Sequence, residues 1–373
     1  MRPVWAEVNL CSVVSNLKEV RRSIPNTTKV MAIVKANAYG HGAGPVAKKM
    51  VENGVEYLGV ALLSEAVQLR EYGISSPILI LGYTPEDDYS ILIRNNITQT
   101  IFTYRQAELL SQAADNLKKN VRIHIKVDTG MGRIGFQPDQ QAIQEIKKIA
   151  ALPALEIEGL FTHLAKSDAR DKSYTFMQLQ KYFWVCNELK KSGIDVALKH
   201  AANSAAIIGI PEADFDLVRP GIMLYGLYPS DEVDISRIHL RQAMALKANI
   251  CHVKNVKAGV NIGYGCTYTT TKAAKIATLP LGYADGYTRL LSNKGVALVR
   301  GQRVPIVGRI CMDQCMLDVS EVDDVEAGEE AVLFGKQGKN FLSIDEVAEL
   351  IGTINYEIVC MISARVPRIY SNS

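Results

Sequence analysis

The sequence lacks any apolar stretch approaching the ~18 residues that a membrane-spanning helix needs. An excess of one charge is also missing, because 42 Lys and Arg face 39 Asp and Glu, a net charge of +3. So weak a bias does not favour a nucleic acid or a membrane surface as partner. Residues 1–7 lack the apolar core of a signal peptide, and the seven cysteines are odd in number and scattered. We therefore expect reduced thiols and a cytoplasmic location.

The composition is that of a globular protein with a full-sized core. Hydrophobic residues make up 48% of the 373 positions and charged residues 22%. This balance excludes a disordered tail, a collagen-like repeat and a disulfide-stapled miniprotein. The length predicts one large domain or two moderate ones.

The first two-thirds of the chain alternate between β-branched runs and segments with helical apolar spacing. The predicted strands are Lys29–Val34, Tyr57–Val60, Pro77–Leu81, Thr98–Phe102, Arg122–Val127, Leu155–Leu160, Val196–His200 and Phe215–Arg219. The predicted helices between them include Pro45–Glu52, Ser64–Glu71, Arg105–Ala113, Ile143–Ala151 and Thr175–Lys191. Such alternation predicts parallel strands, and eight regular units favour a closed (β/α)8 TIM-type barrel over an open doubly wound sheet.

The pattern changes after about Leu227. A polar linker at Pro229–Glu232 leads into strand-like segments without long helices between them: Ala243–Lys254, Lys275–Leu279, Val296–Val299, Val304–Ile310, Met316–Val319 and Ala331–Phe334. A short helix is predicted at Ser343–Gly352, with Ser343 as N-cap. We predict a barrel over residues 1–230 and a mostly antiparallel β domain over 231–373, on which the first few residues could also pack.

Polar residues follow five of the predicted barrel strands. These are Lys35, Arg133, His163, the pair Asn203-Ser204, and Arg219. Each alone is as consistent with a solvated strand end or a buried ion pair as with function. In a barrel of this kind, however, chemistry lies at the C-terminal ends of the strands, so five such residues on one rim favour an active site.

Lys35 directly follows the apolar run Val30–Val34. Burial favours the neutral amine, which can form a Schiff base with a carbonyl group. Loops after the seventh and eighth strands, here Ser204 and Pro220-Gly221-Ile222, often bind phosphate through backbone amides and a hydroxyl. A Schiff-base lysine with a phosphate site points to pyridoxal 5'-phosphate.

Other motifs are weaker. Gly40, Gly42 and Gly44 do not fit a dinucleotide fingerprint because Pro45 occupies its last position, and no P-loop ending follows. Cys311 and Cys315 have no second pair, so no metal site is expected. In the second domain Tyr264 and Tyr283 stand between glycines, and further polar clusters lie at Arg309–Cys315 and Thr353–Glu357. Spacing alone favours β-turns with packed aromatic residues there.

The ordered set of motifs closely resembles the alanine racemase family over essentially the whole chain. The residues that carry the resemblance are Val34–Gly42, Lys126–Arg133, His200–Ser204, Arg219-Pro220-Gly221, Gly282–Gly286 and Cys311–Gln314. The resemblance implies a pyridoxal-phosphate enzyme with a barrel and a β domain. It also implies a homodimer that interconverts L- and D-alanine for bacterial peptidoglycan.

The resemblance also implies roles for individual residues. Lys35 would bind the cofactor and act as base on the D-enantiomer, while Tyr264, entering from the second domain of the partner subunit, would act on the L-enantiomer with help from His163. Arg219 would face the pyridine nitrogen. The phosphate would be bound by Tyr39, Ser204, Gly221, Ile222 and Tyr356. The substrate carboxylate would be held by Arg133 and the Met312 amide, and Tyr283 would narrow the entrance.

Lys126 occupies a position that is often carbamylated in the family. An unmodified lysine there would repel Arg133, so we expect a carbamate, or another anion such as chloride, close by. Two departures from the family pattern are mild: Cys266 and Thr267 fill a variable stretch, and Phe161 stands where a tyrosine is common. Neither is expected to touch a proton-transfer group.

Three alternative functions share part of this pattern. A non-enzymatic pyridoxal-phosphate homeostasis protein would need neither the β domain nor Tyr264. A decarboxylase of the same fold would place a glutamate, not Arg219, toward the pyridine nitrogen. A racemase for serine or a broader set of amino acids stays open, because a small pocket rejects an added hydroxyl only weakly.

Overall fold

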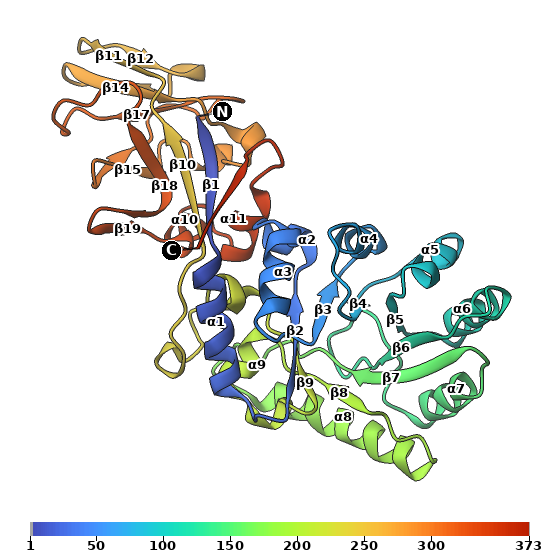
Figure 1. Cartoon of the computed structure of the whole chain (residues 1–373). Coiled ribbons are helices and arrows are strands. Elements are labelled where there is room, and N and C mark those ends of the chain that lie inside the picture. Colours follow the sequence, from blue (N-terminus) through green and yellow to red (C-terminus); the bar gives the residue numbers. More distant parts are fainter. Residues whose placement is uncertain (1–2, 373) are drawn as a thin grey trace. The chain divides into compact units, whose positions relative to one another are not determined.

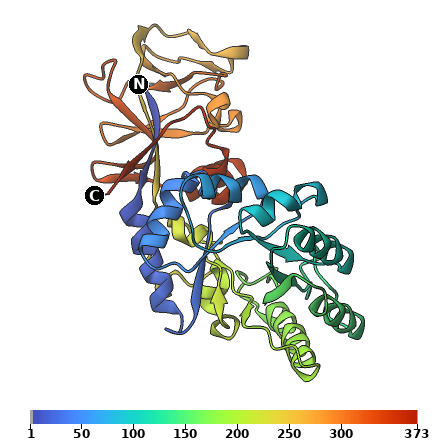
Figure 2. The same cartoon turned by 45° about the vertical axis from the view of Figure 1, so that its right-hand side comes forward.

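The computed structural model describes residues 3–372. By its backbone contacts the chain forms two compact units, shown in Figures 1 and 2. The barrel unit contains Val13–Ala38 and Ala43–Arg241. The β unit contains the described residues of Met1–Ser12, Tyr39–Gly42 and Gln242–Ser373.

The barrel unit is an eight-stranded parallel sheet, which confirms the predicted fold class. Its strands are β2 (Lys29–Ile33), β3 (Tyr57–Val60), β4 (Ile78–Ile80), β5 (Thr98–Ile101), β6 (Val121–Lys126), β7 (Leu155–Phe161), β8 (Leu198–His200) and β9 (Leu217–Val218). Each lies within two residues of the predicted strand. Strands β3, β4 and β5 are buried along their whole length, as expected where helices cover a parallel sheet.

The sheet order is β8-β7-β6-β5-β4-β3-β2-β9. Backbone hydrogen bonds then join the two ends: the Asp216 amide donates to the Lys199 carbonyl at 3.1 Å, and the Arg219 amide donates to the Ala202 carbonyl at 3.0 Å. These bonds close the barrel, because β9 and β8 are the two ends of the strand order. A closed barrel directs the loops that follow its parallel strands to a single rim.

Helices lie along the outside of the barrel strands (Figure 1). They are α3 (Ala43–Glu52), α4 (Leu63–Glu71), α5 (Tyr89–Arg94), α6 (Tyr104–Asn116), α7 (Gln140–Ala150) and α8 (Ser173–Lys191). Capping residues begin two of them, since Thr103 accepts from the Gln106 amide and Asp139 from the Ala142 amide. Three further helical segments are α1 (Leu10–Ser23), which begins in the β unit, α2 (Lys35–Tyr39) and α9 (Ser204–Gly209).

The β unit contains a seven-stranded sheet of order β16-β15-β18-β10-β1-β20, with β19 paired to β18. Its strands are β1 (Val4–Asn9), β10 (Met244–Asn249), β15 (Val296–Val299), β16 (Gln302–Pro305), β18 (Glu330–Gln337), β19 (Asn340–Leu342) and β20 (Arg368–Ser371). All pairs are antiparallel except β1 with β20. Buried and partly exposed residues alternate along β1 and β10, which is the pattern of a sheet with one buried face.

Smaller elements complete the β unit. A second sheet has the order β11-β14-β17, from β11 (His252–Val256), β14 (Ala274–Leu279) and β17 (Cys315–Asp318), and β12 (Asn261–Ile262) pairs with β13 (Tyr268–Thr269). Helix α10 (Ile344–Ile351) begins at the predicted N-cap, where the Ser343 hydroxyl accepts from the Glu346 amide at 3.0 Å, and α11 (Asn355–Met361) follows it.

Two strand predictions were wrong in detail. The run Val304–Ile310 is a strand only over its first two residues, which end β16. The single run Ala243–Lys254 is two strands, β10 and β11, which belong to different sheets. The chain changes sheets between them, where the Ile250 amide donates to the Glu329 carbonyl and the next amide, of Cys251, donates to the Thr278 carbonyl. An apolar run in sequence cannot show such a change of hydrogen-bonding partner.

Candidate active site

The first site segment, after β2, has an unusual backbone. Ala36, Asn37, Ala38 and Tyr39 all have φ between 51° and 54°, so the chain makes one left-handed turn directly after Lys35. Each non-glycine residue in this conformation costs about 1–2 kcal/mol. Such strain persists only where surrounding contacts impose it, and it concentrates at functional sites.

Specific hydrogen bonds hold this turn. The Ala36 amide donates to Oε1 of Glu65 at 2.6 Å, and the other oxygen of Glu65 accepts from the Ala61 amide at 2.8 Å. The Asn37 Oδ1 accepts from the Ala43 amide at 2.8 Å. Lys35 is therefore placed, half-buried, by a backbone that has little freedom to change.

The loops after β8 and β9 meet at Ser204. The Gly221 amide donates to Oγ of Ser204 at 2.9 Å, and Ser204 is buried as the first residue of α9. Asn203 caps this helix, because its Oδ1 accepts from the Ala206 amide. The structure thus brings together the predicted phosphate residues Ser204, Gly221 and Ile222.

Arg219, which follows β9, is buried and contacts residues from the ends of β7 and β8. Its Nη2 donates to the carbonyls of Thr162 and Ala201, and it lies 3.3 Å from Nδ1 of His163. Its Nη1 lies 2.8 Å from Nδ1 of His200. Burial lowers the pKa of Arg219 to about 10, which still leaves the guanidinium charged near neutral pH.

His163 is expected to be neutral. Burial, and then the cations Arg219, Arg133, Lys126 and Lys35, lower its pKa well below the usual value. A guanidinium can only donate hydrogen bonds, so Nδ1 of His163 accepts and its proton is on Nε2. Burial together with Arg219 therefore favours the neutral form of His163, and the contact with Arg219 favours the tautomer with the proton on Nε2.

Lys126 is almost completely buried on β6. Its Nζ donates to the Val127 carbonyl at 2.6 Å and lies 5.5 Å from the centre of the Phe161 ring. Burial first, and then Arg219 and Arg133, lower its pKa to about 7. A substantial fraction of Lys126 is therefore the neutral, nucleophilic amine near pH 7.

The loop that carries Arg133 is organised by Asp128. One carboxylate oxygen of Asp128 accepts from the amides of Gly130, Met131 and Gly132 at 2.8–3.0 Å. Burial raises the pKa of this carboxyl, but the three amides and Lys126 outweigh it and lower the pKa overall. Arg133 itself is exposed on this loop.

The barrel residues suit an anionic cofactor and substrate. The charged groups that perturb the pKa of His163 are all cations, and the one carboxylate that perturbs Lys126 is Asp128, already used by three backbone amides. Buried positive charge without a counterion is unfavourable. A phosphate and a carboxylate would supply that counterion, so the donor set fits pyridoxal phosphate and an amino acid.

In the β unit, Tyr39 lies against Tyr356, the second residue of α11, with ring centres 6.1 Å apart. Gly40 follows at φ 80°, and a Cβ there would lie 2.2 Å from the Val359 carbonyl oxygen, so only glycine fits. Burial, and then Tyr356 and Cys360, raise the pKa of Tyr39. The structure thus brings together two more of the predicted phosphate residues.

Tyr264 stands out on the β unit because 71% of it is exposed. It begins a 3-10 turn, Tyr264–Cys266, between Gly263 and Gly265, both of which have φ above 70°. A tyrosine exposed in this way can contact a surface other than its own turn.

The segments of Tyr283 and Met312 lie side by side. The Tyr283 amide donates to the Cys311 carbonyl and the Ala284 amide to the Met312 carbonyl, both at 3.0 Å. A Cβ on Gly282 would come within 2.3 Å of both carbonyl oxygens, so this approach requires glycine. Tyr283 and Met312 are 42% and 53% exposed.

Sequence reasoning missed a buried polar group beside Arg219. It consists of His200, for which we predicted no role, together with His124 and Glu158. A signal was present: His124 and Lys126 are two residues apart on β6 and so share one face of the strand. Phe161, which was not expected to touch a proton-transfer group, stacks on His200 at 4.7 Å and lies 5.4 Å from the Arg219 guanidinium.

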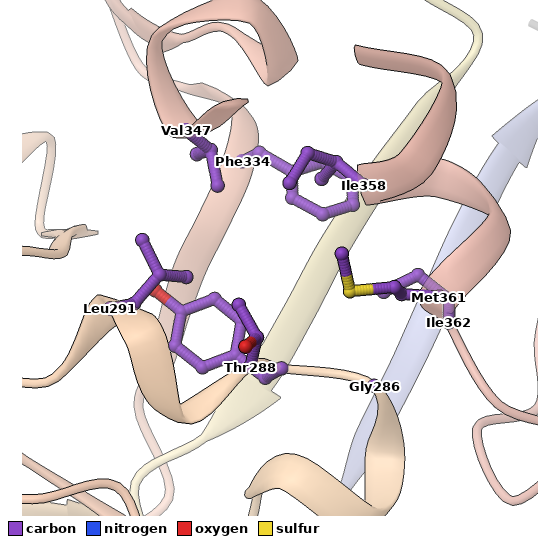
Figure 3. Close-up of a pocket in the computed structure, with 9 residues that line it drawn as sticks. Gly286, Thr288, Leu291, Phe334, Val347, Ile358, Met361 and Ile362 are labelled. Atoms are coloured by element: carbon purple, nitrogen blue, oxygen red, sulfur yellow. The ribbon is translucent and has the colours of Figure 1, made fainter. Parts of the chain in front are cut away.

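Other features carry no candidate residue. The β unit has a pocket lined by apolar side chains, among them Leu291, Phe334 and Met361 (Figure 3). Within residues 3–372 no group of His, Cys, Asp and Glu is placed to hold a metal ion. No described helix is long and apolar enough to cross a membrane.

Comparison with known proteins agrees with this geometry. Residues 8–229 match the family described as alanine racemase, N-terminal domain, and residues 243–370 match alanine racemase, C-terminal domain. Two relatives named alanine racemase, from Methanococcus maripaludis and Desulforamulus reducens, are each 50% identical over 368 residues. The match covers 99% of this chain in both cases, and 98% and 99% of the relatives.

Solved structures agree over the same length. Alanine racemase from Clostridium difficile 630 superposes with a TM-score of 0.96 at 43% identity, covering 100% of this chain and 96% of that one. The Bacillus anthracis enzyme with bound L-Ala-P gives a TM-score of 0.95 at 39% identity, with the same coverage. The chain belongs to the alanine racemase family and is an amino-acid racemase, as its motifs predicted.

Proposed function

We propose that the protein interconverts L- and D-alanine with pyridoxal 5'-phosphate by a two-base mechanism. The observation that carries this proposal is the set of basic side chains around a neutral His163 on the rim of the barrel: Lys35, Lys126, Arg133 and Arg219. The set suits an anionic cofactor and an amino-acid carboxylate. When bound, the cofactor supplies an electron-withdrawing ring that makes the α-proton of an attached amino acid acidic.

The residues that would hold the cofactor are those of the family motifs. Lys35 would bind it through a Schiff base, and Arg219 would face its ring nitrogen. Its phosphate would be bound by Tyr39, Ser204, Gly221, Ile222 and Tyr356. Ser204 and Gly221 are already hydrogen-bonded to each other, and Tyr39 packs against Tyr356, which supports their grouping.

Two bases on opposite faces of the α-carbon would exchange its proton. Lys35, released when substrate binds, would act on the D-enantiomer, and Tyr264 of a second subunit on the L-enantiomer. General acid–base catalysis of this kind contributes about 10²–10⁴ in rate. The 71% exposure of Tyr264 supports a role at a surface other than its own turn.

His163 would assist Tyr264 as a donor. Because Arg219 occupies Nδ1 of His163, the remaining Nε2–H can donate to the phenolate form of tyrosine. That interaction lowers the tyrosine pKa from its ordinary value near ~10 toward neutrality. His163 thus helps Tyr264 accept and return a proton while staying neutral itself.

Substrate recognition would use the remaining site residues. Arg133 and the Met312 amide would bind the carboxylate, and Tyr283, whose segment is hydrogen-bonded to that of Met312, would narrow the entrance. Neutral Lys126 can react with carbon dioxide to give a carbamate and a proton. The resulting anion would orient Arg133, which an unmodified ammonium would repel.

The proposal extends to the assembly and its setting. The β domain, residues 231–373, would contribute to the active site of the partner in a homodimer. The product D-alanine would supply peptidoglycan in a bacterial cytoplasm.

An absorbance spectrum and a racemisation assay on one sample test this function. We expect a visible band from cofactor bound to Lys35, and conversion of L-alanine into a racemic mixture by chiral detection. A band without turnover of alanine would instead favour a binding protein or, if L-serine is converted, a racemase of broader specificity. Absence of a band with added cofactor would contradict the assignment of Lys35.

A further inference from the structure

A chain of hydrogen bonds runs from Arg219 through the barrel interior to Glu158. Nη1 of Arg219 lies 2.8 Å from Nδ1 of His200, and Nε2 of His200 lies 2.9 Å from Nδ1 of His124. Nε2 of His124 lies 3.1 Å from a carboxylate oxygen of Glu158. Both histidines are fully buried, so no water competes for these contacts at their rings.

The donor at one end of the chain and the acceptor at the other fit a single set of proton positions. Arg219 only donates, so Nδ1 of His200 accepts and its proton is on Nε2. That proton is donated to Nδ1 of His124, which therefore carries its own proton on Nε2 and donates it to Glu158. All bonds then point one way, from a cation to an anion, and such bonds strengthen one another.

The surrounding residues are adapted to this arrangement. A Cβ on Gly159 would lie 2.3 Å from Nδ1 of His124, so the glycine leaves room for the imidazole ring. The pairing of β6 with β7 shifts register between Ile123 and His124, which leaves Glu158 as the extra residue of the bulge. β-Bulges recur beside active sites because they redirect a side chain.

Two further contacts hold His200 in position. Its ring is stacked on Phe161 with an angle of 3° between the planes, and its backbone amide donates to the Tyr182 hydroxyl. A flip of the ring about the Cβ–Cγ bond would place Cδ2–H, in place of the accepting Nδ1, against Arg219. A change of tautomer therefore alters the contact of His200 with Arg219 while the His200 ring stays in place.

We propose that Glu158 and His124 are positioning residues of the active site, which keep the His200 proton on Nε2 so that Arg219 holds its place. With the opposite tautomer, His200 would present an N–H to the guanidinium, and Arg219 would move away. Because Arg219 also contacts His163, a shift would reach both the ring nitrogen of the cofactor and the partner of Tyr264. This inference rests on the proposed function for its catalytic consequence.

The groups facing Glu158 favour its charged form. Besides His124, they are Nη1 of Arg122 at 3.1 Å and the Tyr57 hydroxyl at 3.3 Å. Burial raises the pKa of Glu158, but its contacts with His124 and Arg122 outweigh burial and lower it overall. Burial lowers the pKa of both histidines. The charge pattern of the chain therefore persists at neutral pH.

The test combines imidazole NMR with kinetics of the cofactor-loaded enzyme. The sequence has six histidines, few enough to resolve in a 15N-histidine sample. In the wild-type protein, His124 and His200 should each be neutral with the proton on Nε2. A proton on Nδ1 of His200 would overturn the inference without any substitution. Failure of wild-type racemisation would instead overturn the proposed function and leave the tautomers measurable.

Substitutions of Glu158 then test the positioning role. Glu158→Leu removes the acceptor, so His200 should gain Nδ1–H and kcat should fall by about tenfold or more, with KM changed less than about twofold. Glu158→Gln keeps an acceptor oxygen, so the His200 tautomer should be unchanged and kcat should fall by no more than about threefold. The exposed Glu156 on the same strand gives the control Glu156→Leu, which should change neither.

Two outcomes would overturn the positioning role. One is a folded Glu158→Leu protein with an unchanged His200 tautomer. The other is a changed tautomer with wild-type kcat. If Glu158→Leu does not fold, the wild-type tautomers and the Glu158→Gln kinetics still decide, since a Glu158→Gln protein with His200 protonated on Nδ1 contradicts the chain.

Discussion

The two units supply site residues of opposite character. In the barrel unit Lys126, Arg219 and His200 are buried and held by hydrogen bonds and contacts with the Phe161 ring. In the β unit Tyr264, Met312 and Tyr283 are exposed on turns. The barrel therefore fixes the charge and protonation of its site residues within the folded chain. The environment of the exposed residues of the β unit depends instead on the ligand or surface that they contact. Five predictions would break or sharpen this comparison.

Lys35→Ala should have the largest effect, because it removes both the cofactor attachment and one base. We expect racemisation to fall more than about 10³-fold and the visible cofactor band to disappear. The exposed Lys29 at the start of the same strand gives the control Lys29→Ala, which should keep the band and the rate. A retained band in Lys35→Ala would contradict the assignment.

Tyr264→Phe tests the exposed side of the comparison. The change removes one hydroxyl, so turnover of L-alanine should fall by about 10²–10⁴-fold, while unfolding temperature should hardly change because the residue is exposed. Tyr83→Phe, at another exposed tyrosine, should leave the rate intact. A fall in stability of Tyr264→Phe as large as a core mutation would show that the residue is structural.

Arg219→Glu tests the buried side. Arginine cannot give up its proton, whereas glutamate can share one with the ring nitrogen and strengthen the electron withdrawal. We expect slower racemisation together with increased transamination of alanine, measured as pyruvate formation. Arg219→Lys keeps the positive charge and should show no such increase. An unchanged transamination rate in Arg219→Glu would refute this reasoning.

The pH dependence of unfolding should originate in the barrel. Burial lowers the pKa of His124, His163 and His200, so below about pH 6.5 the unfolded chain binds protons that the folded chain does not. The free energy of unfolding should therefore be maximal above this pH and fall as pH falls, by up to about 1.4 kcal/mol per pH unit for each histidine. Urea unfolding at pH 7.5 and 5.5, at one protein concentration, measures it. Equal stability at both values would contradict buried neutral histidines.

Gly159→Ala should have the smallest effect. The added methyl group would overlap the His124 ring, at a cost of about 1–3 kcal/mol in the free energy of unfolding. Gly209→Ala is the matched control, because a Cβ at Gly209 meets no atom within 4 Å. It should be neutral or stabilising by about 0.4–1 kcal/mol. Equal urea midpoints for both variants would show that the space beside His124 is not tight.

Local patterns in the sequence determined the fold class and the motifs. The short runs Tyr57–Val60 and Thr98–Ile101 are buried along their whole length, as strands of a parallel sheet covered by helices are. Ser343 predicted its helix start for the same reason, since the N-cap bond is local. Lys35, His163 and Arg219 were found because parallel strands bring their ends to one rim.

Tertiary structure alone decided what these residues experience. The pKa of Lys126 falls to about 7 because burial and Arg219 act on it together, and Arg219 is far away in sequence. The chain from Arg219 to Glu158 requires four strands to be neighbours and one β-bulge to displace Glu158. The left-handed turn after Lys35 contains no glycine, so its composition does not predict it. Charge, protonation and strain depend on contacts between distant residues, and such contacts exist only in the folded chain.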